Sequence, residues 1–462
     1  MRPHDGGLEA RIDQPEARHR LAIRDGTPVR YRKWPKWPRA DSTTQRNLLD
    51  VLHSTKWTIS GQSDRMLSYE HRFAEAFARY CGMKYCVPCG NGTAALTICL
   101  QSLGIGSGDE VIVPGLTWVA CASAVCHIGA IPILADVDPS TLCLSAGSVR
   151  SLLSERTAAI IAVHLYSCLA PMTELQALAE KSGLALIEDA SQAHGASLNG
   201  RRAGTFGTVS SFSMQQSKLL TSGEGGASLT NDPSLYRRMQ QFRADGRGEA
   251  GADGYDPYRE IVPYGEVLGR NLCLSEFHSA ILLDAIQRLD PENAHRHRNF
   301  IDLTALLGKI DGVTVVSDRQ AEEPTHYKVC LRFDQRLLDG LSVQILARAL
   351  TEELSLPVEP VDAPLNDNPL YRPLLSPQIA RLATAHLYDP RRFDLPEANA
   401  AGRSCITLPH WSLLGDRSDL ENIATAIAKV IDHRDELRAM NIAELRHLPF
   451  RYPRPETEGG QQ

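Results

Sequence analysis

Four short runs of almost uninterrupted apolar residues constrain the fold of this chain more than any other feature. Helix-length segments with polar faces, at 145–156 and 172–183, separate the last three runs. Continuous apolar strands that alternate with helices indicate a parallel sheet covered on both faces, so the chain is predicted to be an α/β protein. Ligands of such sheets bind beyond the carboxyl ends of the strands. The runs are EVIVPGL (110–116), IPILADVD (131–138), AAIIAVHLY (158–166) and LALIEDA (184–190).

The pattern divides the 462 residues into four predicted parts. Residues 41–290 form a large domain, and residues 291–433, which open with the charged helix PENAHRHRNF, form a smaller α+β domain. Residues 1–40 end in VRYRKWPKWPR and predict an extended arm that docks on a domain or on a partner subunit. RNA binding is the alternative for this arm, because basic and aromatic residues interleave there. The tail, residues 434–462, is predicted to be disordered at its polar, Pro- and Gly-rich end.

Charge and cysteine usage exclude several classes of function. The net charge of −6 argues against nucleic acid as the main partner. No run approaches 18 apolar residues, and the N-terminus has no apolar signal segment, so neither a membrane protein nor a secreted one is expected. Eleven scattered cysteines fit free thiols in a reducing cytoplasm. Cys86 and Cys89 form a lone CxxC without a second ligand pair, so no metal is expected.

The first candidate site lies where the strand CVPC passes into Gly90, Asn91, Gly92 and Thr93 and then into a helix. Small residues let backbone N–H groups approach an anion, and a helix N-terminus attracts negative charge. This arrangement suits a phosphate group. The alternative is an ordinary helix cap by Asn91 or Thr93.

Two further candidates are a carboxylate and a lysine. Asp189 closes the apolar run LALIEDA, where it either caps a loop or stays ionised to hold the proton of a heterocyclic nitrogen. Lys218 follows Asp189 by 29 residues (218 − 189), between the β-like run VSSFSM and the Gly-rich turn SGEGG. A desolvated lysine amine is the nucleophile that forms Schiff bases, whereas a surface lysine would have no such role. Pyridoxal phosphate requires a phosphate cup, a carboxylate for its ring nitrogen and a lysine for its aldehyde, so the three candidates together predict this cofactor.

Several segments of the chain resemble those of a known family. NGTAAL, PGLTWVA, EDASQAHGA, SFSMQQSKLLTSGEGGA and GRNLCLSEFHSAI are similar to segments of the DegT–StrS sugar and cyclitol aminotransferases. The resemblance implies a fold-type-I PLP-dependent transferase, with a mainly parallel sheet sandwiched by helices and a smaller C-terminal α+β domain. It also implies a homodimer with shared active sites, because Asn271 in GRNLCL matches an asparagine that reaches the partner subunit's cofactor phosphate.

The resemblance assigns the other site residues position by position. Lys218 matches the Schiff-base lysine and Asp189 the partner of the ring nitrogen. Gln192 matches the residue beside the ring 3-hydroxyl, and Trp118 the aromatic residue that stacks on the ring. The matches to phosphate-binding positions are Gly92, Thr93 and Ser213.

Three segments are similar to one branch of this family. KWPKWPR, QQSKLLTSGEGG and EPVDAPLNDNPLYRP resemble enzymes of aminoglycoside biosynthesis that move an amino group from L-glutamine to scyllo-inosose or 2-deoxy-scyllo-inosose. The alternatives are an aminotransferase acting on a keto nucleotide-sugar, a dehydratase of the same fold, against which Lys218 argues, and a silent PLP-binding regulator. Tyr327, Lys328 and Asn366 are candidates for binding the donor carboxylate.

Two positions depart from the family pattern. Cys273 stands where the family often has Arg, and Ser167 where it often has Gly. The first departure puts in doubt the contact that the Arg would make in the site. The second is expected to reshape the loop that follows VHLY.

Overall fold

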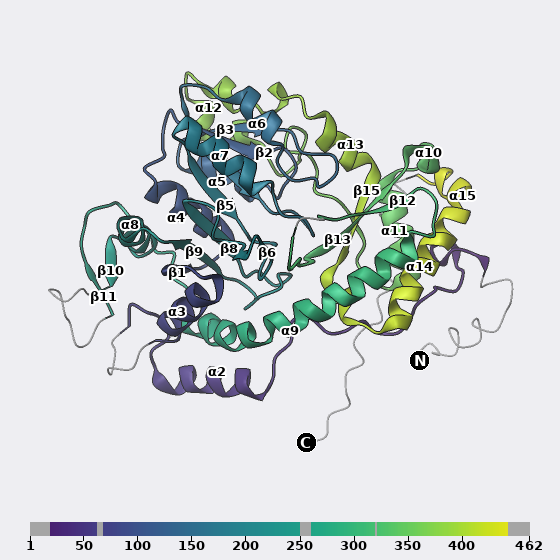
Figure 1. Ribbon diagram of the computed structural model, residues 1–462, viewed down its shortest axis with the longest axis horizontal. Coiled ribbons are helices and arrows are strands. Elements are labelled where there is room, and N and C mark those ends of the chain that lie inside the picture. The colour runs from purple at the N-terminus through teal and green to yellow at the C-terminus, as the bar shows by residue number, and fades with distance from the viewer. Residues whose placement is uncertain (1–18, 62–67, 250–259, 319–320, 442–462) are drawn as a thin grey trace, which may run out of the picture.

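Seven strands form the central sheet of the computed structural model (Figure 1). The structure describes residues 19–61, 68–249, 260–318 and 321–441. The order across the sheet is β1-β9-β8-β5-β4-β2-β3; β9 is antiparallel to both of its neighbours, and all other pairs are parallel. The mainly parallel α/β fold predicted from the sequence is therefore confirmed. The strands are β1 Tyr85–Cys89, β2 Glu110–Pro114, β3 Ile131–Ala135, β4 Thr157–Val163, β5 Ala185–Asp189, β8 Val209–Ser213 and β9 Gly226–Thr230.

Helices with apolar faces pack on this sheet. Inside the large hydrophobic core, α4 packs against β8, β9, α5 and α8, and α7 packs against β4, β5 and α6. The helix α4 is buried almost throughout, so it carries no clear amphipathic stripe and its sequence, GTAALTICLQS, is apolar on all sides. The helices are α3 Tyr69–Cys81, α4 Gly92–Ser102, α5 Ala120–His127, α6 Ala146–Leu152, α7 Met172–Ser182 and α8 Pro233–Arg243.

A second, four-stranded antiparallel sheet lies at the other end of the molecule, in the order β12-β13-β15-β14 (Figure 1). Apolar residues of β13 and β15 share a separate hydrophobic core with α11 and α14. The smaller C-terminal α+β part predicted from the sequence is therefore confirmed. The elements are β12 Val313–Val316, β13 Lys328–Phe333, α11 Val343–Leu354, β14 Glu359–Pro360, β15 Cys405–Pro409 and α14 Arg417–Asp432.

One long helix, α9 (Glu276–Leu307), runs along both sheets (Figure 1). The prediction that a helix begins at PENAHRHRNF is wrong, because Pro291 lies inside α9 and the helix begins after the Ser275 cap. Proline removes one backbone hydrogen bond, and packing against α2 (Ser42–Ser54), α3 and α14 holds the helix together across it. The predicted domain division at 290/291 falls within this helix and stays a prediction.

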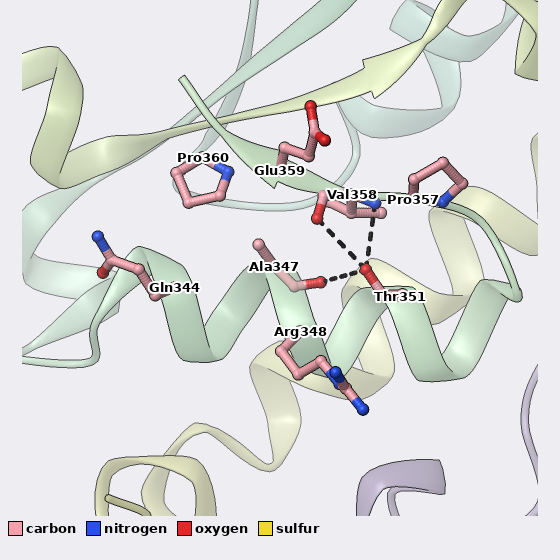
Figure 2. Close-up of a pocket in the computed structure, with 8 residues that line it drawn as sticks. All are labelled: Gln344, Ala347, Arg348, Thr351, Pro357, Val358, Glu359 and Pro360. Carbon is pink, nitrogen blue, oxygen red and sulfur yellow. Dashed lines mark hydrogen bonds between the residues drawn. The ribbon is translucent and has the colours of Figure 1, made fainter. Parts of the chain in front are cut away.

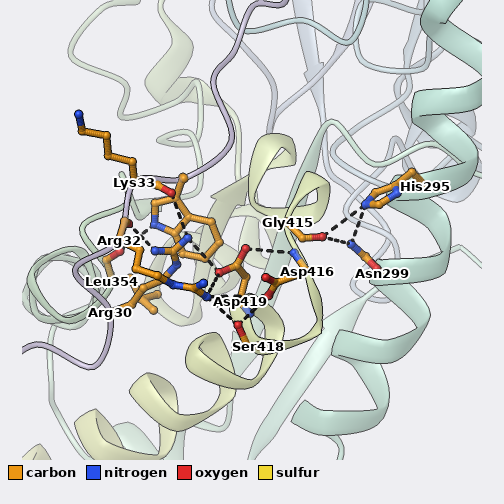
Figure 3. Close-up of polar contacts among 11 residues, drawn as sticks. Arg30, Arg32, Lys33, His295, Asn299, Leu354, Gly415, Asp416, Ser418 and Asp419 are labelled. Atoms are coloured by element: carbon orange, nitrogen blue, oxygen red, sulfur yellow. Dashed lines mark hydrogen bonds and ion pairs between the residues drawn. The ribbon is translucent and has the colours of Figure 1, made fainter. Parts of the chain in front are cut away.

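The arm is described from residue 19 onward and lies on its own chain. Arg30 and Arg32 reach the Asp419 carboxylate at the start of α14, with N–O distances of 2.9 Å and 3.0 Å, and the Trp34 indole donates to Leu354 O (Figure 3). Leu21 is fully buried in the second core. The first 18 residues and the end of the tail, from 442, lie outside the described residues.

Shorter elements connect these parts, and none of the described helices is long and apolar enough to cross a membrane. They are η3 Ala22–Arg24, β6 Ser197–Leu198, β7 Arg201–Arg202, β10 Arg247–Glu249, β11 Ile261–Pro263, α10 Gln335–Leu338, η4 Pro373–Leu375, α12 Pro377–Ala380, η5 Ala385–Tyr388, η6 Pro390–Arg392, α13 Pro396–Ser404, η7 His410–Leu414 and α15 Arg434–Arg438.

Candidate active site

A cavity of about 810 Å³ opens at the carboxyl ends of β5 and β8, between the large sheet and β13–β14. This volume is within the range of small-molecule sites. The structure brings seven of the eight predicted site residues to its wall. They are Gly92, Thr93, Trp118, Asp189, Gln192, Ser213 and Lys218. Trp118 is 54% exposed, so its indole is available to a flat ligand.

Asp189 ends β5 and is almost completely buried. Its Oδ1 accepts a hydrogen bond from the Ser191 N–H at 3.1 Å, and its Oδ2 accepts one from the Cys121 thiol at 3.3 Å. Burial and the nearby carboxylate raise the pKa of Cys121, so this thiol stays protonated and donates. No cation forms an ion pair with Asp189 in the part of the chain that the structure describes. A buried carboxylate held only by neutral donors fits a ligand that brings its own N–H⁺.

The N-terminus of α4 forms the opposite wall. Asn91 caps the helix by accepting from the Ala94 N–H at 2.8 Å, so the ordinary capping role considered for Asn91 is present. A Cβ at Gly92 would lie 2.6 Å from the Cβ of Ser213, and one at Gly226 would lie 2.4 Å from Asn91 O. The two glycines therefore let the helix start close to Ser213. The first-turn N–H groups and the Ser213 hydroxyl form a cradle that suits a phosphate.

Lys218 lies in a tight loop between β8 and β9. Backbone hydrogen bonds from Met214 to Gly225 O and from Gln216 to Gly223 O close the loop, both at 2.7 Å. Gly223 has φ 90° and Gly225 has φ 157°, which explains the Gly-rich turn SGEGG. The half-buried Lys218 side chain places Nζ 4.1 Å from the centre of the Tyr327 ring.

Tyr327 couples this loop to the second sheet. Its hydroxyl lies 2.8 Å from Ser217 Oγ. Burial acts to raise the pKa of Tyr327, but the charges of Lys218 and Lys328 outweigh it and hold this pKa below its ordinary value. The two lysines thus face a phenol that gives up its proton more readily than an isolated tyrosine does. Two of the candidates for the donor carboxylate, Tyr327 and Lys328, line the cavity, whereas Asn366 does not and donates to Phe393 O.

Gln192 is oriented by an unusual backbone. Its Oε1 accepts from the Tyr166 N–H at 2.7 Å, and Tyr166 has φ 59°, in the left-handed region. Ser167, the residue that replaces the usual glycine, donates its hydroxyl to Lys328 O at 2.9 Å. This bond ties the loop after β4 to β13. The expected reshaping of the loop stays a prediction.

The other departure, Cys273, lies outside the cavity wall. Its Sγ faces Arg243 O at 3.7 Å, and it packs beside Ile59, Ala244 and Ile261. Asn271, the eighth predicted residue, is exposed and does not line the cavity of its own chain. Its assignment to a partner's site stays a prediction.

Sequence reasoning missed the acidic end of the cavity. Glu359 and Asp362 line it from β14 and the loop that follows, and Glu359 pairs with Lys328 Nζ at 3.0 Å. Burial raises the pKa of Asp362, although Lys328 and Lys218 partly oppose it. The segment EPVDAP shows no strand periodicity, because its strand is only two residues long, and its likeness to the family gave neither carboxylate a role.

A second pocket, of about 460 Å³, lies between α11 and β14 (Figure 2). Its polar groups serve the fold: Thr351 Oγ1 bonds to Ala347 O and to both backbone groups of Val358. Arg348 pairs with Glu352. No predicted site residue reaches this pocket, so the larger cavity is the candidate active site.

The sheet order, the second antiparallel sheet and the cavity at the strand ends define the fold of the fold-type-I aminotransferases. Residues 38–428 match the sequence model of the DegT/DnrJ/EryC1/StrS aminotransferase family. The chain belongs to this family, which depends on pyridoxal phosphate, and the resemblance found in its sequence is confirmed.

Three known proteins show how close the likeness is. The L-glutamine:2-deoxy-scyllo-inosose aminotransferase of Streptomyces kanamyceticus is 45% identical over 422 residues, which cover 91% of this chain and 99% of that protein. The L-glutamine:scyllo-inosose aminotransferase of Streptomyces griseus is 43% identical over 421 residues, covering 90% and 99%. The crystal structure of 3-amino-5-hydroxybenzoic acid synthase superposes with a TM-score of 0.75 at 29% identity, covering 87% and 99%.

Proposed function

We propose that this aminotransferase moves the amino group of L-glutamine to the ketone of a keto-cyclitol of the 2-deoxy-scyllo-inosose type, with pyridoxal phosphate as its cofactor. The observation that carries the proposal is the convergence of Asp189, Lys218 and the α4 N-terminus on one cavity. The relatives that share about nine tenths of the chain act on such substrates by name.

The residues present fit the cofactor. Gly92, Thr93 and Ser213 would hold its phosphate, Asp189 its ring nitrogen and Trp118 the ring face. When bound, pyridoxal phosphate supplies an electron sink for the electrons of a broken C–H bond.

Lys218 performs the proton transfers in this proposal. As a free amine, its Nζ takes the proton from the α-carbon of glutamine, and in the second half of the reaction it delivers a proton to the acceptor carbon that has received the nitrogen. Asp189, whose oxygens already accept two hydrogen bonds, would accept the N–H of the ring nitrogen and so hold its proton there. Tyr327 lies against Lys218 and excludes water from one side of its amine.

The acidic end of the cavity supports a polyol acceptor. Glu359 and Asp362 offer carboxylate oxygens to hydroxyl groups, and Lys328 between them offers a donor. A cyclitol carries a hydroxyl on most ring carbons and no charge, so it matches a wall of this kind. A nucleotide-sugar fits this wall less well, because it would also bring a negatively charged diphosphate toward these carboxylates.

A homodimer in the cytoplasm completes the proposal. The exposed Asn271, outside the cavity of its own chain, supports a role in the site of a second copy. All eleven cysteines are free thiols, which supports a reducing compartment.

One assay tests the substrate. Purified protein with pyridoxal phosphate and glutamine is given a panel of keto-cyclitols and keto-nucleotide-sugars, and products are identified by mass spectrometry. An aminocyclitol with matching loss of glutamine is expected. If only the keto-nucleotide-sugars were aminated, the keto-cyclitol would be the wrong acceptor. If no compound of the panel were aminated, the proposal would be overturned.

A further inference from the structure

A guanidinium lies fully buried on α9, away from the cavity wall. Arg296 is among the largest side chains without exposed area in the structure. Its Nη2 contacts Glu292 at 3.1 Å, and its other hydrogen bonds go to the neutral side chains of Asn293 and His410. A buried cation that gives two of its three side-chain hydrogen bonds to neutral groups is costly to fold, since Glu292 alone offsets its charge. Its role lies in what those neutral groups hold.

The first of them, Asn293, holds the segment that carries Asp189. Arg296 Nη1 donates to Asn293 Oδ1 at 3.0 Å. The amide group is thereby oriented, and its Nδ2 donates to His194 O at 2.9 Å. His194 lies in the loop between β5 and β6, which follows Asp189 and includes Gln192. Only Asn293 therefore lies between the guanidinium and the loop that carries Gln192 to the cavity.

The second, His410, holds the peptide beside Lys218. Arg296 Nε donates to His410 Nδ1 at 3.2 Å, and His410 Nε2 lies 3.1 Å from Ser217 O. A guanidinium nitrogen can only donate, so Nδ1 must accept and Nε2 must carry the proton. Burial and the charge of Arg296 keep the pKa of His410 well below its ordinary value, which preserves the neutral ring. The imidazole thus bonds to the carbonyl directly before Lys218.

The arm closes this cluster from outside. The Trp37 ring meets His410 edge to face at 4.5 Å, and the Arg296 guanidinium lies 5.0 Å from the Trp37 ring centre. Trp37 comes from KWPKWPR, the arm motif that the catalytic proposal leaves without a role. Through Trp37, the arm contacts His410, and His410 bonds to Ser217, the residue before Lys218.

We propose that Arg296 is a positioning residue that fixes the Asp189 loop through Asn293 and the Lys218 loop through His410, with Trp37 of the arm as its cover. The inference rests on the proposed roles of Lys218 and Asp189. Both must be aligned with one small ring, and a shift of about 1 Å in a reacting group can cost about a hundredfold in rate. One rigid cation shared by the two loops sets their spacing.

The test compares two variants of His410. His410→Leu removes the bond to Ser217 O, whereas His410→Gln keeps an N–H donor near the Nε2 position. For each, the dissociation constant of pyridoxal phosphate is measured from the absorbance of the lysine-bound cofactor, along with the pH midpoint of that band. We expect Arg296→Met and His410→Leu to weaken binding about tenfold and to move the midpoint, because each breaks the relay of hydrogen bonds that aligns Lys218. His410→Gln should restore both values.

Arg30→Gln is the matched control. It also removes a buried guanidinium, which pairs with Asp419 (Figure 3), and neither residue lines the cavity. Thermal unfolding without cofactor shows how much stability each variant loses. If His410→Leu and Arg296→Met change the binding and the band no more than Arg30→Gln does, the positioning role is wrong.

Borohydride reduction of the wild-type protein separates this inference from the function on which it rests. A pyridoxyl label on Lys218, found by peptide mass spectrometry, is expected. A missing label in the wild type would overturn the proposed function. If the wild type is labelled and His410→Leu leaves the cofactor binding and the absorbance band unchanged, the positioning role alone is overturned.

Discussion

At the scale of single residues, the site depends on side chains with few substitutes. Lys218 is held by a closed loop with its amine against Tyr327, and Asp189 is a buried carboxyl group that forms no ion pair among the described residues. Because the amine of Lys218 and the carboxyl group of Asp189 perform different chemistry, substitutions at the two positions are expected to have different effects on the reaction.

Lys218→Ala is expected to abolish turnover and the absorbance band of the lysine-bound cofactor, because no other amine replaces the nucleophile and proton carrier. Spectra and single-turnover assays with glutamine measure both effects. Lys181→Ala, at an exposed lysine of α7, is the control and should behave as wild type. Catalysis that survives intact in Lys218→Ala would refute the assignment.

Asp362→Asn tests the acidic end of the cavity. If this carboxylate accepts a hydrogen bond from a substrate hydroxyl, its loss should raise KM for the ketone about tenfold, since a bond to a charged group contributes about 1.5–3 kcal/mol. The KM for glutamine should change less. Asp367→Asn, exposed in the same segment, is the control. Equal KM values for the ketone in both variants would remove Asp362 from the binding site.

At the scale of elements, the start of α4 is the most constrained junction. The strand β1 ends at Cys89, the helix begins at Gly92, and the helix start must pass close to Ser213 on β8. The sequence NGT predicted an anion-binding turn. The contact with Ser213, which requires the glycine, comes only from the pairing of β1, β9 and β8.

Gly92→Ala is expected to weaken cofactor binding by about tenfold or more, because the new Cβ would lie 2.6 Å from Ser213 Cβ and push the helix start away. Fluorescence or absorbance titration with pyridoxal phosphate measures the change. Gly147→Ala in the first turn of α6 is the control, since its Cβ would meet Ser145 Oγ at an ordinary 3.6 Å. Unchanged affinity in Gly92→Ala would contradict the cradle.

At the scale of the whole molecule, buried neutral histidines couple stability to pH. Burial, with help from His297 and Arg296, lowers the pKa of His326 to about 3. The unfolded chain protonates this ring near its ordinary pKa of about 6.5, so below that pH the unfolded state binds the extra proton. The contribution of His326 to stability is thus present above about 6.5 and is lost as pH falls toward 3.

His326→Asn should therefore flatten the pH dependence of the unfolding free energy. Between about pH 6 and 4.5, its slope should be smaller than that of the wild type by about 1.4 kcal/mol per pH unit. Urea unfolding at several pH values measures the slope, and His53→Asn, on the exposed surface of α2, is the control. Parallel curves for wild type and His326→Asn would show that His326 is not buried neutral.

The proposed dimer gives a test of assembly. Protomers carrying Lys218→Ala and Asn271→Ala are each expected to be inactive or severely impaired. Mixed and reassembled, they should recover up to about half of the wild-type activity per hybrid dimer, because one of the two sites then has both residues. Activity of the mixture equal to the mean of the two parents would refute shared sites. Size-exclusion chromatography confirms that hybrids form.

The sequence by itself determined the parallel sheet, the seven cavity residues and the family, because strand periodicity and contiguous motifs are local. It misplaced the start of α9, because Pro291 is tolerated where neighbouring helices support the backbone. Glu359, Asp362 and the cluster around Arg296 became visible only in the tertiary structure. Their partners lie far apart in the chain, as Ser217 does from His410, and such contacts are set by packing rather than by any local pattern.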